Sequence, residues 1–192
     1  MDWNSDIKIY PTDRLFAATV GRLMPSAVRP NHLTIFRLVL VPFVLAALLS
    51  GRFGWGLGLF LVASLTDWFD GALARTRREV TRWGVIYDPV VDKILIGTTL
   101  LVIVTEYMNA TLGIVLLGVE AAIVFQGWYY VRRGVIQPAS RWGKAKMVAE
   151  VVGISLLLLA LLADINLLVG VSHGTIALAI VFAVISVLTR IK

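Results

Sequence analysis

The sequence predicts an all-α integral membrane protein with six transmembrane helices and a short amphipathic surface helix near the N-terminus. Of its 192 residues, 58% are hydrophobic and only 16% are charged, which excludes an ordinary soluble, coiled-coil or disordered chain. A spanning helix needs about 20 apolar residues, so this length leaves no room for a separate soluble domain beside the spans. We therefore expect residues 1–192 to form one membrane-embedded domain.

The N-terminal segment, residues 1–30, carries charges at short intervals and no long apolar run. Around Arg14 and Arg22, apolar residues such as Phe16 and Val20 alternate with the charged ones. This pattern suits a helix lying on the membrane surface. An ordered polar lead-in to the first span is the alternative.

Six apolar stretches fill the core of the chain, residues 33–190. They are residues 33–49, 54–70, 85–105, 112–131, 147–163 and 169–189. Each is long enough to cross a bilayer, some with help from flanking residues. Length and apolar composition thus predict six spans.

The basic residues are sorted to one side of these spans. When the six stretches are threaded through a bilayer, every lysine and arginine except Arg52 falls on the same side. The positive-inside rule makes that side cytoplasmic, so we expect both termini on the cytoplasmic face of the cell (inner) membrane. The excess of 18 Lys and Arg over 12 Asp and Glu favours anionic lipid or a phosphorylated substrate over nucleic acid as the partner.

Four aspartates lie within the second and third predicted spans: Asp67, Asp70, Asp88 and Asp92. Charged side chains inside a span are costly and mark functional sites. On a helix, one face of the second span carries Asp67, Asp70, Gly71, Ala74 and Arg75. Asp67 lies about 12 Å along that helix from Arg75, which places it below the lipid headgroups. Asp88 and Asp92 project together from the third span, and Pro89 between them suits the first turn of a helix.

Four carboxylates in a poorly solvated place would repel one another unless a cation lay among them. The chain has no cysteine, and all-oxygen ligation favours Mg²⁺ or Mn²⁺ over Zn²⁺. Four carboxylates can hold a pair of such ions, as in phosphoryl-transfer sites. The alternative is a set of buried ion pairs, which leaves the small residues on the same helix face unexplained. The cations for such pairs would be Arg75, Arg78, Arg82 and Lys93.

The aspartates belong to a longer pattern: Asp67-x-x-Asp70-Gly71-x-x-Ala74-Arg75 followed, after eight residues, by Gly84-x-x-x-Asp88-x-x-x-Asp92. This pattern strongly resembles the signature of the CDP-alcohol phosphotransferase family. Two more motifs extend the resemblance over most of the chain: Pro30-Asn31-His32-Leu33-Thr34-x-x-Arg37 and Gly143-Lys144-x-Lys146. In this form the sequence looks like the phosphatidylglycerophosphate synthase branch.

The resemblance implies a six-helix homodimer whose polar cavity and active site open to the cytoplasm. It implies that Asp67, Asp70 and Asp88 ligate two divalent cations. It also implies that Asp92 contributes to this metal site and acts as the general base. The CDP-binding site implied by the family consists of Asn31, Thr34, Asp70, Gly71, Ala74, Arg75 and Gly84.

Basic residues on the predicted cytoplasmic side could bind an anionic acceptor. The candidates are Lys93, Arg132, Arg133, Arg141, Lys144 and Lys146. Ordinary positive-inside charge is the alternative for this group. Glu120 and Glu150 either line the cavity or bond neighbouring helices. The fourth span of the glycerophosphate branch more often carries an arginine beside a glutamate, whereas Val119 precedes Glu120 here, so the acceptor is the open point.

The resemblance thus predicts an enzyme that transfers the phosphatidyl group of CDP-diacylglycerol to glycerol 3-phosphate, giving phosphatidylglycerophosphate and CMP. Inositol phosphate, serine or phosphatidylglycerol are alternative acceptors for the same chemistry. A non-enzymatic cation carrier would also explain the buried aspartates. That reading leaves four residues of the pattern unexplained: Gly71, Ala74, Arg75 and Gly84.

Overall fold

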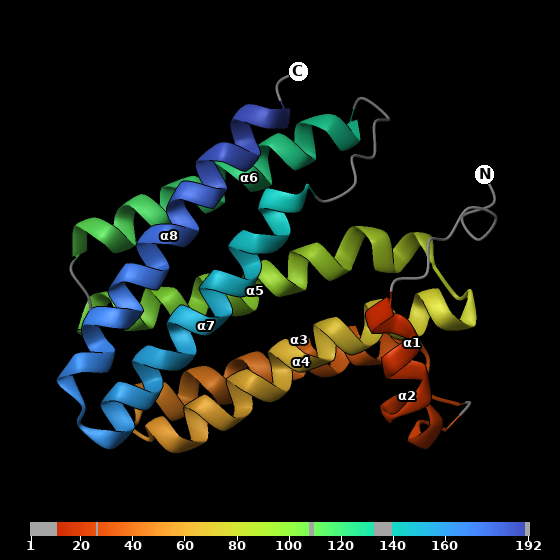
Figure 1. Cartoon of the computed structure of the whole chain (residues 1–192), viewed down its shortest axis with the longest axis horizontal. Helices are drawn as coiled ribbons and strands as arrows, with labels where there is room; N and C mark the ends of the chain where they lie inside the picture. Colours follow the sequence, from red (N-terminus) through yellow and green to blue (C-terminus); the bar gives the residue numbers. More distant parts are fainter. Residues whose placement is uncertain (1–10, 26, 108–109, 133–139, 191–192) are drawn as a thin grey trace. The chain divides into compact units, whose positions relative to one another are not determined.

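Eight helices make up the described part of the chain (Figure 1). The computed structural model describes residues 11–25, 27–107, 110–132 and 140–190, and no strand occurs among them. The helices are α1 (Pro11–Ala18), α2 (Val20–Leu23), α3 (Pro30–Leu49), α4 (Phe53–Arg77), α5 (Arg82–Tyr107), α6 (Ala110–Arg132), α7 (Arg141–Ala163) and α8 (Asn166–Arg190). Each of the six predicted apolar stretches lies within one of the helices α3 to α8. The all-α class is therefore confirmed.

Several of these helices suit a membrane interior. The four that are long and apolar enough to cross a bilayer are Pro30–Leu49, Phe53–Arg77, Arg141–Ala163 and Asn166–Thr189. Helix α6 contains a shorter apolar stretch, Gly113–Gly127. Helix α5 is continuous, but charged residues interrupt the apolar sequence of its first half: Asp88, Asp92 and Lys93. The fold is that of an integral membrane protein, and the number of six spans stays a prediction.

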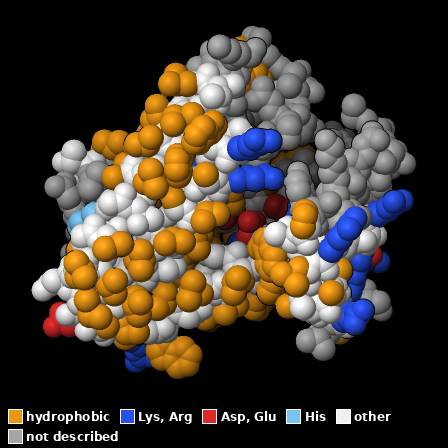
Figure 2. Space-filling view, in the orientation of Figure 1, with side chains coloured by type: hydrophobic (Ala, Val, Ile, Leu, Met, Phe, Trp, Pro, Cys, Tyr) orange, Lys and Arg blue, Asp and Glu red, His pale blue; other side chains and the backbone are white. Residues whose placement is uncertain are grey.

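Large hydrophobic side chains are exposed along each of the helices α3 to α8. One example from each helix, in order, is Phe43, Trp55, Leu101, Phe125, Val148 and Leu188. Hydrophobic side chains also spread over much of the face seen in Figure 2. Soluble proteins rarely expose apolar surface on this scale, whereas helices that face lipid do.

Capping residues set the ends of the helices that carry the predicted site. Helix α4 ends before Arg78, which adopts a left-handed conformation (φ 54°), and the N–H of Glu79 donates to the carbonyl of Ala74 at 2.9 Å. Helix α7 begins after Ser140, whose hydroxyl accepts a hydrogen bond from the N–H of Gly143 at 3.0 Å. This cap explains why α7 starts ahead of the apolar stretch at Met147.

Helix α5 begins earlier than predicted. It starts at Arg82, so Pro89 lies inside the helix, and the prediction that Pro89 occupies a first helical turn is wrong. The hydroxyl of Thr81 accepts a hydrogen bond from the N–H of Gly84 at 3.0 Å, as a capping side chain does. This cap, which apolarity alone does not reveal, starts the helix ahead of the proline.

The chain divides into two compact units. Unit 1 contains Met1–Val44 and Gly58–Leu95, and unit 2 contains Leu45–Leu57 and Ile96–Lys192. Helices α1 and α2, most of α3 and α4, and the first half of α5 thus belong to unit 1. Helices α6, α7 and α8 belong to unit 2. That the whole chain forms one domain stays a prediction.

Within unit 1, α1 packs against α4. Phe16 is buried in a cluster with Ala72 and Leu73 of α4. The ring of Phe16 also lies close to two aromatic rings of α4, with centroid distances of 5.4 Å to Phe69 and 6.1 Å to Trp68. The short helix predicted in the N-terminal segment is therefore present, and its inward face is held by apolar contacts.

An ion pair also joins α1 to α4. Asp13 is fully buried and accepts hydrogen bonds from Nε and Nη2 of Arg75, at 2.9 and 2.8 Å. Two parallel bonds of this kind fix the plane of a guanidinium group as well as its position. The N-terminal helix therefore orients an arginine that the sequence pattern assigns to the site.

Within unit 2, α7 and α8 approach closely at Gly153. A Cβ atom at this position would lie 2.6 Å from Cγ1 of Ile176 on α8. The hydroxyl of Ser172 donates to the carbonyl of Gly153 at 2.9 Å. Glycine thus lets the two backbones come together, as small residues do between membrane helices.

We expect Gly153→Ala to destabilise the protein by about 1–3 kcal/mol, because the added methyl group overlaps Ile176. Thermal unfolding in detergent should show a lower Tm. The control is Gly174→Ala on α8, where an added Cβ would have no neighbour within 4 Å. Equal Tm values for Gly153→Ala and the wild-type protein would contradict the close packing.

We expect Asp13→Ala to release α1 from α4, because the two hydrogen bonds between Arg75 and Asp13 are lost. Local opening should become easier by about 1–3 kcal/mol, or roughly 5- to 150-fold in amide hydrogen exchange over residues 11–18. Arg14→Ala is the matched control, since Arg14 is exposed on the same helix. Unchanged exchange in Asp13→Ala would show that apolar contacts alone hold α1.

Candidate active site

One face of α3 contacts both helices that carry the aspartates. Asn31, Thr34 and Arg37 are spaced three residues apart, so their side chains lie on the same side of α3. Thr34 and Arg37 are buried, at 1% and 0% exposure. The site of unit 1 is therefore built on three polar residues in the first half of a mainly apolar helix.

Arg37 binds two of the predicted metal ligands. Its Nη1 lies 2.8 Å from Oδ1 of Asp67, and its Nη2 donates a hydrogen bond to Oδ2 of Asp70. Its Nε donates to the hydroxyl of Thr66 at 3.4 Å, and that hydroxyl donates to the carbonyl of Ala63 at 2.6 Å. All three polar edges of the guanidinium thus contact α4.

Thr34 and Asn31 contact the start of α5. The Thr34 hydroxyl donates to Oδ1 of Asp88 at 2.6 Å. The Thr81 hydroxyl donates to Oδ1 of Asn31 at 2.9 Å. A Cβ atom on Gly84 would lie 3.1 Å from Oδ2 of Asp88 and 3.4 Å from Oδ1 of Asn31. The structure therefore brings together Asn31, Thr34, Gly84 and Asp88, which the family pattern assigns to one site.

The aspartates share one neighbourhood but are not arranged as a ready metal site. Among the residues that the structure describes, no three His, Cys, Asp or Glu side chains are grouped so that they could hold a metal ion. Asp67 and Asp88 are nevertheless close enough to Asp70 to repel its negative charge. Three carboxylates around one guanidinium leave negative charge that a divalent cation would offset, so the donor chemistry fits.

Asp92 is buried on α5, one turn after Asp88, at 9% exposure. Its place on the same helix agrees with the predicted projection of the two carboxylates toward one side. Its predicted role as the general base stays a prediction.

Gly71, Ala74 and Arg75 lie on α4 and are partly exposed. A Cβ atom on Gly71 would lie 3.1 Å from Nη1 of Arg75, so the glycine makes room for the guanidinium. Asp13 binds the opposite edge of the same group, through Nε and Nη2. The arrangement places an oriented cation beside a glycine and an alanine on the surface of α4, which suits a phosphate group.

The predicted acceptor residues are spread over both units. Lys93 lies on the unit 1 part of α5, and the others lie in the sequence of unit 2. Arg132, Arg141 and Lys144 are exposed, and Arg133 lies outside the described residues. Their common pocket therefore stays a prediction.

Lys146 differs from these residues because it is buried and paired. It donates a hydrogen bond to Glu120 of α6 and lies 3.2 Å from Oε1 of Glu150 on α7. The side chains of Lys146, Glu120 and Glu150 are 6%, 11% and 1% exposed. Glu120 therefore has the predicted role of bonding a neighbouring helix, from α6 to α7, whereas Glu150 pairs with Lys146 within α7.

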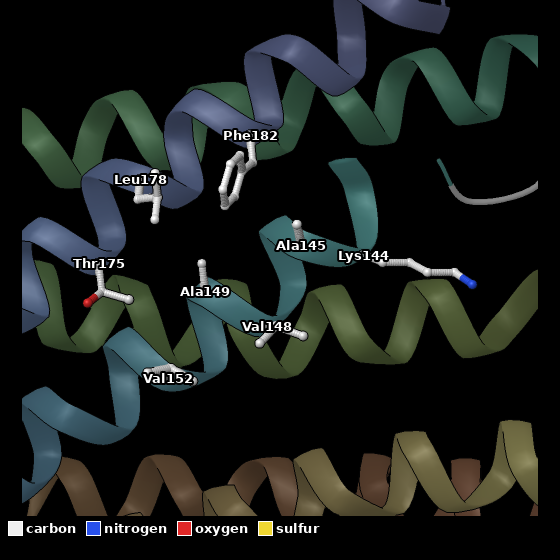
Figure 3. Close-up of a pocket in the computed structure, with 8 residues that line it drawn as sticks. All are labelled: Lys144, Ala145, Val148, Ala149, Val152, Thr175, Leu178 and Phe182. Carbon is white, nitrogen blue, oxygen red and sulfur yellow. The ribbon is translucent and has the colours of Figure 1, made fainter. Parts of the chain in front are cut away.

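A groove of about 500 Å³ lies between α7 and α8 (Figure 3). Its lining is mainly apolar and consists of Lys144, Ala145, Val148, Ala149, Val152, Thr175, Leu178 and Phe182. Lys144 is the one charged residue in this lining. None of the predicted metal-binding aspartates is among its lining residues.

Two residues of the site are assigned no role there by the sequence pattern. Arg37 is predicted only as a cytoplasmic charge and a motif residue, although a basic residue within an apolar span is itself a signal. Asp13 is one of several charges in the N-terminal segment. Nothing in the sequence identifies Arg75, more than sixty residues away, as its partner.

Comparison with known proteins agrees with the motif. The chain matches the CDP-alcohol phosphatidyltransferase family over residues 27–189. A protein of Bacillus subtilis (strain 168), named CDP-diacylglycerol--glycerol-3-phosphate 3-phosphatidyltransferase, is 32% identical over 147 residues, which cover 68% of this chain and 76% of that protein. A protein of the same name from Rickettsia felis is 32% identical over 134 residues, covering 68% and 74%.

A third relative of that name, from Salmonella choleraesuis, is 40% identical over 85 residues, which cover 42% of this chain and 46% of the relative. The family match includes all of α3 to α7 and nearly all of α8. It therefore contains the aspartates, Arg37 and Arg75, and confirms the resemblance that the motif predicts. The chain belongs to the CDP-alcohol phosphatidyltransferase family.

Proposed function

We propose that this protein transfers the phosphatidyl group of CDP-diacylglycerol to glycerol 3-phosphate. The hydroxyl oxygen of the acceptor forms a bond to the phosphatidyl phosphorus, and the bond from that phosphorus to the CMP oxygen breaks. The products are phosphatidylglycerophosphate and CMP. The observation that carries this proposal is the convergence of Asp67, Asp70 and Asp88 on one face of α3, within the family signature.

We propose two divalent cations, Mg²⁺ or Mn²⁺, as cofactors held by Asp67, Asp70 and Asp88 with a contribution from Asp92. The mutual repulsion of carboxylates around Asp70 supports this, because a cation relieves it. When bound, such ions neutralise the diphosphate and stabilise the charge that develops on CMP.

Residues of α4 are proposed to receive the CDP group. Arg75 binds the diphosphate through a guanidinium that Asp13 holds in one plane. Gly71 and Ala74 have no bulky side chain, so the nucleotide can approach the helix backbone. Asn31, Thr34 and Gly84 lie together beside Asp88 and complete the proposed nucleotide site.

Asp92 is proposed as the general base that accepts the proton of the attacking hydroxyl. Its burial removes competing water, and its position one turn from Asp88 places it on the helix that carries a proposed metal ligand. The proton moves from the acceptor oxygen to the Asp92 carboxylate as the new bond to phosphorus forms.

Glycerol 3-phosphate is proposed as the acceptor because the names of the relatives described above include this compound. Lys93, Arg132, Arg133, Arg141, Lys144 and Lys146 are the proposed residues for its phosphate. Lys146 could contribute only by leaving Glu120 or Glu150, with which it is paired. We also propose a homodimer whose active site faces the cytoplasm, as the positive-inside rule and the family resemblance suggest.

Purified protein in detergent or lipid nanodiscs should release CMP from CDP-diacylglycerol when glycerol 3-phosphate and Mg²⁺ or Mn²⁺ are present. Chelation with EDTA should abolish the reaction, and added metal should restore it. Parallel reactions with inositol phosphate, serine and phosphatidylglycerol identify the acceptor by lipid product. No CMP with any acceptor would refute the enzyme proposal, and a different lipid product would refute only the acceptor.

Asp92→Asn should lower kcat by about 10²- to 10⁴-fold, because an amide cannot take up the proton. Binding of Mn²⁺ should change much less, since Asp67, Asp70 and Asp88 remain. Asp164→Asn is the matched control, because Asp164 is exposed at the end of α7 and far in sequence from the motif. If Asp92→Asn turns over at the wild-type rate, Asp92 is not the general base.

A further inference from the structure

Arg37 is a buried cation among the carboxylates proposed as metal ligands. It is 0% exposed and contacts Oδ1 of Asp67 and Oδ2 of Asp70, one oxygen from each. A guanidinium removed from water is stable only when its charge is matched by such partners. The two aspartates therefore already have a cation between them, and it is part of the protein.

The two carboxylates differ in their access to solvent. The side chain of Asp67 is 28% exposed, whereas that of Asp70 is 4% exposed. Arg37 reaches them from α3 and is itself fully buried. Of the two carboxylates, Asp67 is therefore the one that a cation arriving from solvent can contact first.

From this geometry we propose that Arg37 is a positioning residue that serves as the internal counter-cation of the aspartate cluster and competes with divalent cations for Asp67 and Asp70. A guanidinium and a divalent cation draw on the same carboxylate charge and repel each other at short range. Binding of the metal must therefore weaken the hold of Arg37, and Arg37 must weaken binding of the metal by the same factor. The inference rests on the proposed function, because it takes these aspartates as metal ligands.

The proposed competition and a purely structural role for Arg37 predict opposite changes in metal affinity when Arg37 is removed. If Arg37 only shaped the site, its removal would disorder the ligands and weaken metal binding. If it competes, its removal strengthens metal binding, and the metal-free protein loses stability because two carboxylates lose their partner.

Mn²⁺ binding to the full chain in nanodiscs, measured by the EPR signal of free Mn²⁺, tests the proposal. Arg37→Gln should bind Mn²⁺ with a Kd roughly 10- to 100-fold lower than that of the wild-type protein. Its Tm should be lower without metal and should rise more on addition of Mn²⁺. Arg22→Gln is the control, since it removes the same charge from an exposed position.

A tighter Kd in Arg37→Gln with an unchanged Kd in Arg22→Gln supports the competition, and an equal or weaker Kd overturns it. If Arg37→Gln does not fold, Arg37→Lys serves instead, because an ammonium group keeps the charge but cannot bridge both carboxylates as a planar guanidinium does. Its Kd should be lower than that of the wild-type protein, and a higher Kd overturns the proposal.

The two proposals fail separately. If neither the wild-type protein nor Arg37→Gln binds Mn²⁺ saturably, the proposed competition is overturned. The proposed enzyme activity is then still tested by the CMP-release assay. Tighter Mn²⁺ binding in Arg37→Gln, together with no CMP release from CDP-diacylglycerol by the wild-type protein with any acceptor, overturns the proposed function and supports the role of Arg37.

Discussion

Charged side chains buried within apolar helices need partners, and this requirement determines how the helices of each unit meet. In unit 1, Arg37 of α3 is matched by Asp67 and Asp70 of α4. In unit 2, Lys146 of α7 is matched by Glu120 of α6 and by Glu150. Because an unpartnered buried charge is far more costly than a lost apolar contact, each pair specifies the rotation and depth of the helices that carry it.

The same requirement connects the architecture to the chemistry. Carboxylates are retained in α4 and α5 although each one weakens the apolar character of its helix. Asp13 orients Arg75, and Arg37 holds two aspartates, so charged groups near the donor site are positioned by other charged groups. In the proposed function, Asp13 holds Arg75 in a fixed orientation for a polyanionic substrate, whereas a divalent cation at Asp67 and Asp70 has to loosen their contacts with Arg37.

Apolar composition predicts the helices well because every stretch of the core that suits a span is a helix. It does not predict where the helices start. Ser140 caps the first turn of α7 with a single hydrogen bond, and Thr81 does the same for α5. The motif likewise selects the residues of the site but not their partners. The contacts of Arg37 and Asp13 depend on how three helices pack, and that packing is not encoded in any local spacing of the sequence.

The pairing of Glu120 with Lys146 bears on how the protein enters the membrane. Glu120 lies in the middle of the shorter apolar stretch Gly113–Gly127, where an acidic residue disfavours insertion by about 2–3 kcal/mol. Its counter-ion is supplied by the next helix in the chain. In the predicted six-span topology, α6 lacks the charge of Lys146 until α7 has been synthesised, which favours entry of the two helices into the bilayer together as a hairpin.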